Sequence, residues 1–283
     1  MIGVVKMTQE KKKRSIPLTV LLTLVALGQL VPLIWLFDFS LAKSGDLFGS
    51  NMFILPDPPQ WGNYAKAWIN GKIPQYFVNS IIVNAVSIGL VAVFSVTMAY
   101  AFTRMKWKLS KPLLALVTIG IMVPIHATLL PNFLIFTRLK IADTYLGLIL
   151  PYVAFGLPMG TFIMTGFMEG VPHSVEESAI LDGCNTRQLI FRIIFPLVRP
   201  AIVTVIIMTY ISTWNEFIMA ATFVADDSLR TLPYAVYNFA GEYSADYAVQ
   251  FAVMMLVALP SLLIYAFLSD RITAGVTEGA LKG

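Results

Sequence analysis

The sequence is poor in charged residues. Only 13% of its 283 residues are Asp, Glu, Lys or Arg, whereas a soluble domain carries roughly 25%. Because 57% of the residues are hydrophobic, this shortage predicts an integral membrane protein rather than a soluble domain. The single cysteine, Cys184, excludes an internal disulfide framework.

Metal ligands and phosphate-binding motifs are scarce as well. Two histidines and one cysteine leave no plausible metal site. The apolar stretches contain no paired acids or activated nucleophile, which argues against a membrane enzyme. The sequence also lacks the G-x-x-x-x-G-K-[ST] motif, and the chain therefore has no phosphate-binding loop of this type. Any ATP chemistry must belong to a separate subunit.

Long charge-poor windows fill most of the sequence. A helix that crosses a bilayer needs about 20 mainly apolar residues, and these windows are longer and more uniformly apolar than barrel strands. We therefore predict an all-α integral membrane fold with a single transmembrane domain over 1–283. Its six predicted spans cover about 16–37, 77–102, 112–136, 145–168, 198–224 and 248–269.

Lys and Arg are distributed unevenly over the loops between these spans. With a cytoplasmic N-terminus, the inner face receives most of them, including the cluster at 11–14 and the segment 104–111. The positive-inside rule then places both termini in the cytoplasm. The apolar stretch after residues 11–14 is too long for a signal-peptide h-region, and no A-x-A-like site follows it. We expect a retained first helix in a multi-pass protein of a bacterial inner or plasma membrane.

A charged segment, residues 172–196, connects the fourth and fifth predicted spans. An S-x-x-E capping box begins at Ser174, Gly183 is a natural helix stop, and Asn185 with Gln188 predicts a cap for a second short helix. The first helix is not basic, unlike helices that bind anionic membranes. A rigid bent unit of this kind suits insertion into a cleft on a cytoplasmic partner.

The same segment resembles the EAA motif of ABC importer permeases. That motif reads E-A-A, two residues, D-G, nine residues, I-x-L-P, and this chain has E-S-A, D-G and I-I-F-P at the same spacing. The segments that extend the resemblance to the carbohydrate branch, and to its maltose-type second permease with six helices, are NSIIVNAVSIGLVAVFSVTMAYAFTRMKW (79–107), IADTYLGLILPY (141–152), TFIMTGFMEGVPHSVEES (161–178) and TAGVTEGALKG (273–283). The resemblance implies the type I ABC importer permease fold with a cytoplasmic coupling loop.

The resemblance also implies a function and a set of partners. The chain would form the pathway for a sugar that an extracytoplasmic solute-binding protein delivers. It would pair with a second homologous permease as a heterodimer and with two ATP-binding subunits. ATP and Mg would bind to those subunits, so this chain itself would hold no cofactor. We expect no nucleic-acid partner.

Specific residues take roles from the family's coupling helix, which docks in a groove of the ATPase. Glu177 would pair with a basic residue of that groove, Ala179 would permit close approach, and Gly183 would set the bend. Asp182 would hold the turn through backbone hydrogen bonds, either as a local cap or in contact with the partner. The coupling residues that we predict are Glu177, Ala179, Asp182, Gly183, Ile193 and Pro196.

Polar residues inside the predicted spans are candidates for the substrate pathway. An acid such as Glu216 usually faces a bundle interior or water, and Trp214 and Asn215 would add a stacking surface and hydrogen-bonding groups for a sugar. Helix–helix contacts or an acid at the interface would explain the same residues. The prolines that flank His126 predict a kinked third span. The pathway candidates are Trp214, Asn215, Glu216, His126 and Asn84.

Two outer loops are long. The loop 38–76 contains LPDPPQW, which we expect to be extended because proline disfavours helix. The loop 226–246 carries Tyr234, Tyr237 and Tyr243, and the resemblance implies that it reaches the solute-binding protein. Aromatic anchoring at the membrane interface is the competing explanation.

Other interpretations of the chain stay open: an ABC permease for a polyamine, phosphate or peptide, or a secondary transporter or channel without ATP.

Overall fold

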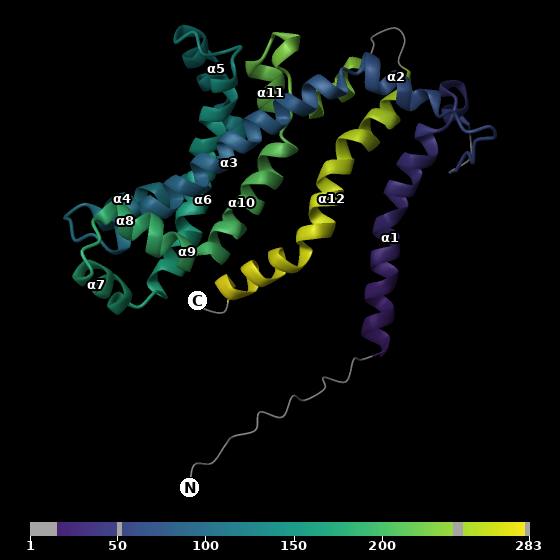
Figure 1. Ribbon diagram of the computed structural model, residues 1–283. Helices are drawn as coiled ribbons and strands as arrows, with labels where there is room; N and C mark the ends of the chain where they lie inside the picture. Colours follow the sequence, from purple (N-terminus) through teal and green to yellow (C-terminus); the bar gives the residue numbers. More distant parts are fainter. Residues whose placement is uncertain (1–15, 50–52, 240–245, 281–283) are drawn as a thin grey trace.

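The computed structural model describes residues 16–49, 53–239 and 246–280, and these residues form helices and turns without a strand (Figure 1). Among them, four helices are long and apolar enough to cross a membrane. Each coincides with one of the long charge-poor windows, so the fold is the predicted all-α membrane fold. The four helices are α1 (Ile16–Ser40), α3 (Ile73–Thr103), α6 (Tyr145–Glu169) and α12 (Tyr247–Ala280).

The third predicted span, 112–136, is broken rather than continuous. The chain forms α4 (Ser110–Ile119) and α5 (Leu129–Arg138), and two short 3₁₀ turns lie between them. The two arms meet at 96°. The break falls at Pro124, which has no backbone N–H to continue the ladder. The predicted kink in this span is therefore present in the structure.

The fifth predicted span, 198–224, also differs from one straight helix. Helix α10 (Arg199–Trp214) ends inside it, and α11 (Ile218–Phe223) follows after a short turn. At its other end, α10 meets the preceding helical segment Thr186–Leu197 at 80°. Counting each bent pair as one span gives up to six spans among the described residues.

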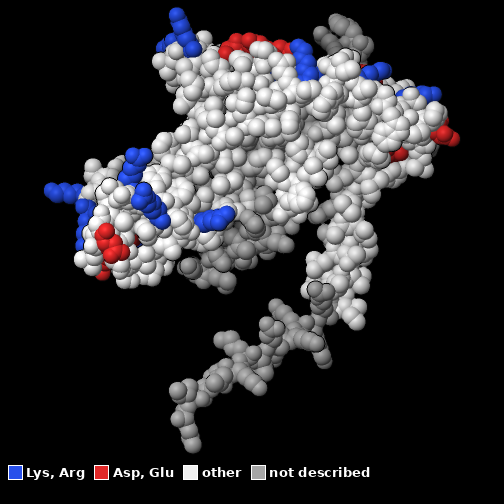
Figure 2. Space-filling model, in the orientation of Figure 1, with Lys and Arg blue, Asp and Glu red and all other residues white. Residues whose placement is uncertain are grey.

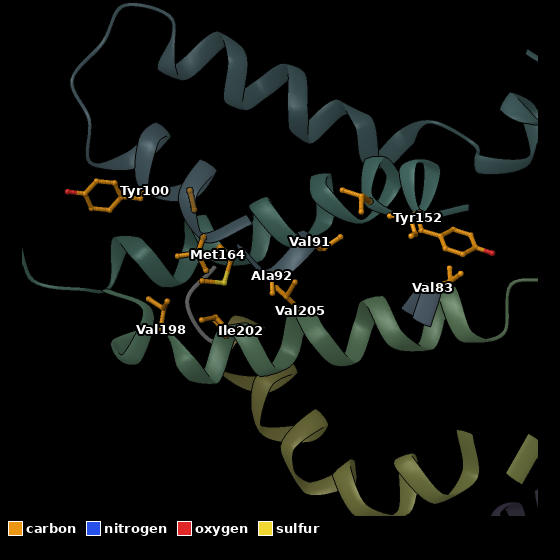
Figure 3. Packing of buried hydrophobic residues seen from close by; sticks show 14 of the residues in the cluster. Val83, Val91, Ala92, Tyr100, Tyr152, Met164, Val198, Ile202 and Val205 are labelled. Carbon is orange, nitrogen blue, oxygen red and sulfur yellow. The ribbon is translucent and has the colours of Figure 1, made fainter. Parts of the chain in front are cut away.

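The centre of the molecule is the contact between α3 and α6. Side chains of α3, α6 and α10 meet there in one buried cluster that includes Val91 and Val205 (Figure 3). A Cβ added to Gly156 would lie 2.8 Å from Val91 Cγ2, and one added to Gly160 would overlap Ser95 Oγ. The G-x-x-x-G spacing therefore lets the two helix backbones approach closely.

Helix α1 stands at the edge of the bundle beside α12 (Figure 1). Their contact is aromatic: the Phe251 ring of α12 lies 5.4 Å from the Trp35 ring and 5.5 Å from the Phe39 ring of α1, centroid to centroid. From Ile16 to Pro32, α1 is largely apolar and exposed in the isolated chain. In a protein that crosses a bilayer, lipid or another membrane helix covers such a surface.

The first long loop has more structure than the sequence predicted. Residues 53–60 contain no helix, as expected for LPDPPQW, but the segment is not extended throughout, because it bends at Asp57 and Pro58 and the φ of Leu55 is +46°. Asp38 accepts hydrogen bonds there from the backbone N–H groups of Ile54 (2.7 Å) and Leu55 (3.0 Å). The loop also contains a helix, α2 (Gly62–Asn70). Asn63 anchors α2 by donating to the carbonyl oxygens of Ser40 and Ala42 at 2.9 Å each.

Charged side chains gather at the ends of the bundle. Lys and Arg are concentrated around α4 and α7–α9 at the lower left of Figure 2, while the middle of the visible face is almost free of charge. The start of α1 and the end of α12 lie toward the same lower side as α7 (Figure 1). The basic cluster at 11–14 and Tyr243 lie outside the described residues.

Candidate functional site

The segment 172–196 begins with the short helix α7 (His173–Leu181). Its N-cap is Pro172, whose extended backbone starts the helix without a side-chain cap. The capping box predicted at Ser174 is wrong, because Ser174 already lies inside the first turn. Its carbonyl oxygen instead accepts a 2.8 Å hydrogen bond from the Ser178 hydroxyl.

The turn after α7 forms as the sequence predicted. Gly183 has a φ of +85°, a left-handed conformation that glycine adopts without a Cβ penalty. Two hydrogen bonds close this turn, from Gly183 N to Ile180 O and from Cys184 N to Ala179 O, both 3.0 Å. Helix α7 ends at Leu181, so Asp182 is the C-cap and its side chain is exposed.

The second arm starts with the predicted cap. Asn185 and Gln188 form a reciprocal capping box at the start of α8 (Thr186–Gln188), with both bonds 2.9 Å. A π-helical turn, η4 (Leu189–Ile194), and α9 (Phe195–Leu197) follow. Ile193 is half-buried against the central cluster, and Pro196 is exposed just before the bend into α10.

The two faces of α7 differ sharply. Glu176 and Ala179 are buried, and Ala179 belongs to the central hydrophobic cluster. Glu177 is exposed, and two apolar side chains at the end of the helix are exposed as well: 59% of Ile180 and 87% of Leu181. Ala179 therefore packs inward in this chain and does not form part of the outward face.

The buried face of α7 contacts Arg104 at the end of α3. The Arg104 side chain is 3% exposed, and its Nε lies 3.2 Å from Glu176 Oε1. Its Nη2 donates to the carbonyl oxygens of Met168 and Val171, the latter at 2.6 Å. Tyr100 donates to Glu176 Oε2 at 3.4 Å. The sequence did not predict this cluster, although two adjacent acids on one helix lie about 100° apart and therefore point in different directions.

A second feature is a cavity of about 360 Å³ between α6, α10 and the break after α4. Most of its wall is apolar, and its polar groups come from Tyr152, Thr209, Ser212, Thr213 and Glu216. Pockets of this size that combine an apolar wall with a few polar groups are typical of small-molecule sites.

Glu216 lies at this cavity, and its carboxylate is already bonded to the chain. Oε1 accepts from Met219 N at 2.8 Å, and Oε2 accepts from Ala220 N at 3.3 Å and from the Tyr152 hydroxyl at 2.9 Å. The carboxylate thus satisfies backbone N–H groups at the start of α11, which would otherwise lack partners. Glu216 stabilises the break that separates α10 from α11.

The other predicted pathway residues occupy different positions. Trp214 is buried in a second hydrophobic cluster, 5.9 Å from the Phe77 ring. Asn84 is buried behind the cavity wall and accepts a 2.5 Å hydrogen bond from the Thr213 hydroxyl. Asn215 and His126 are exposed and do not line the cavity. Of the five candidates, only Glu216 contributes to the wall.

Hydrogen bonds connect the loop 226–239 to the start of α3. Asp227 accepts from the Lys72 ammonium and from the Tyr76 hydroxyl, and Arg230 lies 3.3 Å from it. The Lys72 hydrogen bond, followed by that of Tyr76, lowers the pKa of Asp227 below its ordinary 3.8. Tyr234 is buried under the Arg230 guanidinium. Tyr237 remains 59% exposed.

Comparisons with known proteins agree on one kind of membrane component. A family model described as "Binding-protein-dependent transport system inner membrane component" matches residues 91–277. The chain is 36% identical to a putative ABC transporter permease protein, ORF2, of Caldicellulosiruptor sp., over 89% of this chain and 92% of that protein. It is 30% identical to the diacetylchitobiose uptake system permease protein NgcG of Streptomyces coelicolor, over 93% and 87%.

A solved structure shares the fold. The chain superimposes with a TM-score of 0.75 on a chain of a bacterial ABC transporter involved in the import of the acidic polysaccharide alginate. The match covers 90% of this chain and 95% of the other at 22% identity.

Within the described residues, the chain offers no group of three His, Cys, Asp or Glu side chains that could hold a metal ion.

Proposed function

Because the chain belongs to the inner-membrane components of binding-protein-dependent transport systems, we propose that this ABC importer permease carries a sugar. Support for a sugar comes from the diacetylchitobiose relative and from the segments that resemble the carbohydrate branch. The permease is the membrane-spanning subunit and does not itself catalyse ATP hydrolysis. ATP and Mg bind to a separate pair of subunits, because this sequence has no phosphate-binding loop of the usual type.

The exposed face of α7 carries the proposal for coupling. Ile180 and Leu181 expose apolar side chains on a short helix outside the long spans, beside the exposed acid Glu177. This surface, which is apolar with one acid, would fit a groove that is apolar and contains one basic residue. We expect such a groove on the ATPase subunit. Glu177 then pairs with the basic residue, and Gly183 and Pro196 set the angles of the two arms.

We propose that the cavity between α6 and α10 is the part of the substrate pathway that this chain forms. The hydroxyl groups of Tyr152, Ser212 and Thr213 donate within the chain, and their oxygens can accept hydrogen bonds from a sugar. Glu216 holds the wall in shape through its backbone contacts. Trp214 and Asn84 support the same wall from behind. Asn215 and His126, which are exposed, would act only against the second permease.

The remaining partners follow from the same proposal. The second homologous permease covers the open side of the cavity, and a heterodimer results. Both termini and α7 face the cytoplasm, where the basic residues around α7–α9 gather (Figure 2). The loop 226–239 then faces outward, and its exposed Tyr237 contacts the solute-binding protein.

A paired substitution tests the coupling proposal. Glu177→Ala removes the acid from the exposed face of α7, and Glu169→Ala removes an exposed acid at the end of α6 as a control. Loss of one partner of a buried ion pair costs about 3–5 kcal/mol. Glu177→Ala should therefore leave membrane insertion intact but release the ATP-binding subunits on purification. Full retention of those subunits and of uptake would contradict the proposal.

A substrate panel tests the choice of solute. The complex, reconstituted with its binding protein, would be offered labelled mono- and oligosaccharides, including diacetylchitobiose, beside a polyamine and a dipeptide. Uptake of a sugar in strict dependence on ATP is the expected result. If only the polyamine or the dipeptide were taken up with ATP, the proposal of a sugar substrate would be wrong and that solute would be the substrate.

A further inference from the structure

One arginine joins three separate elements at the inner end of the bundle. Arg104 follows the last residue of α3, and its Nε faces the carboxylate of Glu176 on α7. Its Nη2 donates to the carbonyl oxygens of Met168 in α6 and of Val171 just after it. Its Nη1 also lies 2.9 Å from Nδ1 of His173. The donors of this guanidinium therefore define the relative positions of α3, α6 and α7.

The Arg104–Glu176 ion pair is buried, so its two partners cannot be replaced by water. The side chains of Arg104 and Glu176 are 3% and 10% exposed, so neither charge can exchange its partner for bulk water. The planar guanidinium faces the carboxylate with Nε, an ion pair without hydrogen-bond alignment, while Nη2 donates to two carbonyl groups. A lysine ammonium lacks this fixed planar fork of donors. The position of α7 on α3 is thereby fixed by one ion pair and its surrounding hydrogen bonds.

The opposite end of α3 is fixed as firmly. Asn79 donates to the carbonyl oxygens of Ser228 and Arg230 at 2.8 and 2.9 Å, and Ser80 Oγ accepts from Leu232 N at 2.8 Å. Helix α3 has 31 residues, which gives it a length of about 45 Å. It is thus attached to α7 at one end and to the loop 226–239 at the other.

We propose that Arg104 and Glu176 are positioning residues that lock the coupling helix α7 to α3, so that α3 moves with the ATPase as one rigid body and carries that motion to the outer loop. This inference rests on the proposed function of the exposed face of α7. The division of labour follows from adjacent positions on one helix: Glu177 faces the partner and Glu176 faces α3. Arg104 contacts neither ATP nor the transported solute in this scheme.

A distance measurement on the assembled complex tests the lock. Spin labels at Ser178→Cys on α7 and Val86→Cys on α3, with Cys184→Ser to remove the native thiol, report the separation of the two helices. Val86 is 18 residues before Arg104, about 27 Å along α3, and both label sites are exposed. Double electron–electron resonance would be recorded without nucleotide and with ATP, Mg and vanadate.

The proposal predicts one narrow distance distribution in the parent complex, with the same centre in both states. Glu176→Gln removes the charge while keeping the shape, and Arg104→Lys keeps the charge while losing the fork. Each should broaden the distribution and shift its centre when ATP is added, whereas Glu169→Gln should leave it unchanged. If Glu176→Gln fails to insert, Arg104→Lys alone decides the question.

Two results would overturn the lock. One is a distance that changes with ATP in the parent complex, and the other is a distribution in both variants that stays as narrow and as constant as in the parent. Absence of the ATP-binding subunits from the purified parent would instead refute the proposed function. In that case the distributions without nucleotide still show whether Arg104 and Glu176 hold α7 on α3.

Discussion

The close contact between α3 and α6 allows a quantitative test at Gly160. In Gly160→Ala, the new Cβ would overlap Ser95 Oγ and lie 3.2 Å from Ser95 Cβ and 3.3 Å from Val205 Cγ1. Overpacking of this kind costs about 1–3 kcal/mol. Alanine also gains up to about 1 kcal/mol of helix propensity over glycine. The second effect must be measured separately, and Gly166 in the same helix has no neighbour within 4 Å of an added Cβ.

The assay is thermal unfolding of the two purified variants in the same detergent. Gly166→Ala should unfold at the parent temperature or slightly above it, and Gly160→Ala several degrees lower, because 1 kcal/mol corresponds to about 2–4 °C for a chain of 150–250 residues. Ser95→Ala should restore part of the loss, since it removes the overlapping hydroxyl, which has no hydrogen-bond partner. Equal stability of Gly160→Ala and Gly166→Ala would refute this account of the helix contact.

Three further predictions concern the turn and the outer loop. Gly183→Ala should destabilise the turn after α7 by about 1–2 kcal/mol, because a Cβ disfavours the left-handed backbone; unchanged amide exchange at the turn would count against it. Asn185→Ala should cost about 1 kcal/mol through the lost cap, again visible as faster exchange in α8. The lowered pKa of Asp227 means that its stabilising contribution is present at neutral pH and lost as the pH falls below 3.8. Asp227→Asn should flatten that part of the stability–pH curve, and an unaltered curve would contradict the assignment.

Local signals predicted the turn after α7 well. Gly183 is needed where the backbone turns left-handed, and Asn185 and Gln188 satisfy each other's backbone groups over a spacing of three residues. Both features depend on neighbours in the sequence, so the pattern carries enough information. Ser174 failed as a cap because Pro172 starts the helix two residues earlier, although the S-x-x-E spacing is present.

Long-range contacts could not be predicted from the sequence. Arg104 and Glu176 are 72 positions apart, and only the packing of α3 against α6 and α7 brings them together. From the sequence, Arg104 was only one of the Lys and Arg residues in a predicted inner loop, and these residues indicated the topology. For the same reason, the sequence did not show that Ala179 faces the core and leaves the outer face of α7 to Glu177 and its apolar neighbours.

The fifth span shows why a polar residue in an apolar window is ambiguous. Glu216 does line the cavity, as expected for an acid in a bundle, but its oxygens cap α11. Trp214, two residues earlier, turns to the other side of α10 and packs in a separate cluster. The composition of the fifth span predicted that it contains pathway residues. Which of its side chains reaches the cavity depends on the break after Trp214, which the composition does not show.

Cross-linking from the exposed end of α7 tests the central claim most directly. A photoreactive residue at Leu181, which is 87% exposed, would be activated in intact membranes and the captured protein identified by mass spectrometry. The account predicts capture of a subunit that contains a phosphate-binding loop. Labelling of Leu181→Cys by a membrane-impermeant reagent from the outside of intact cells, or capture without any ATP-binding subunit, would contradict it.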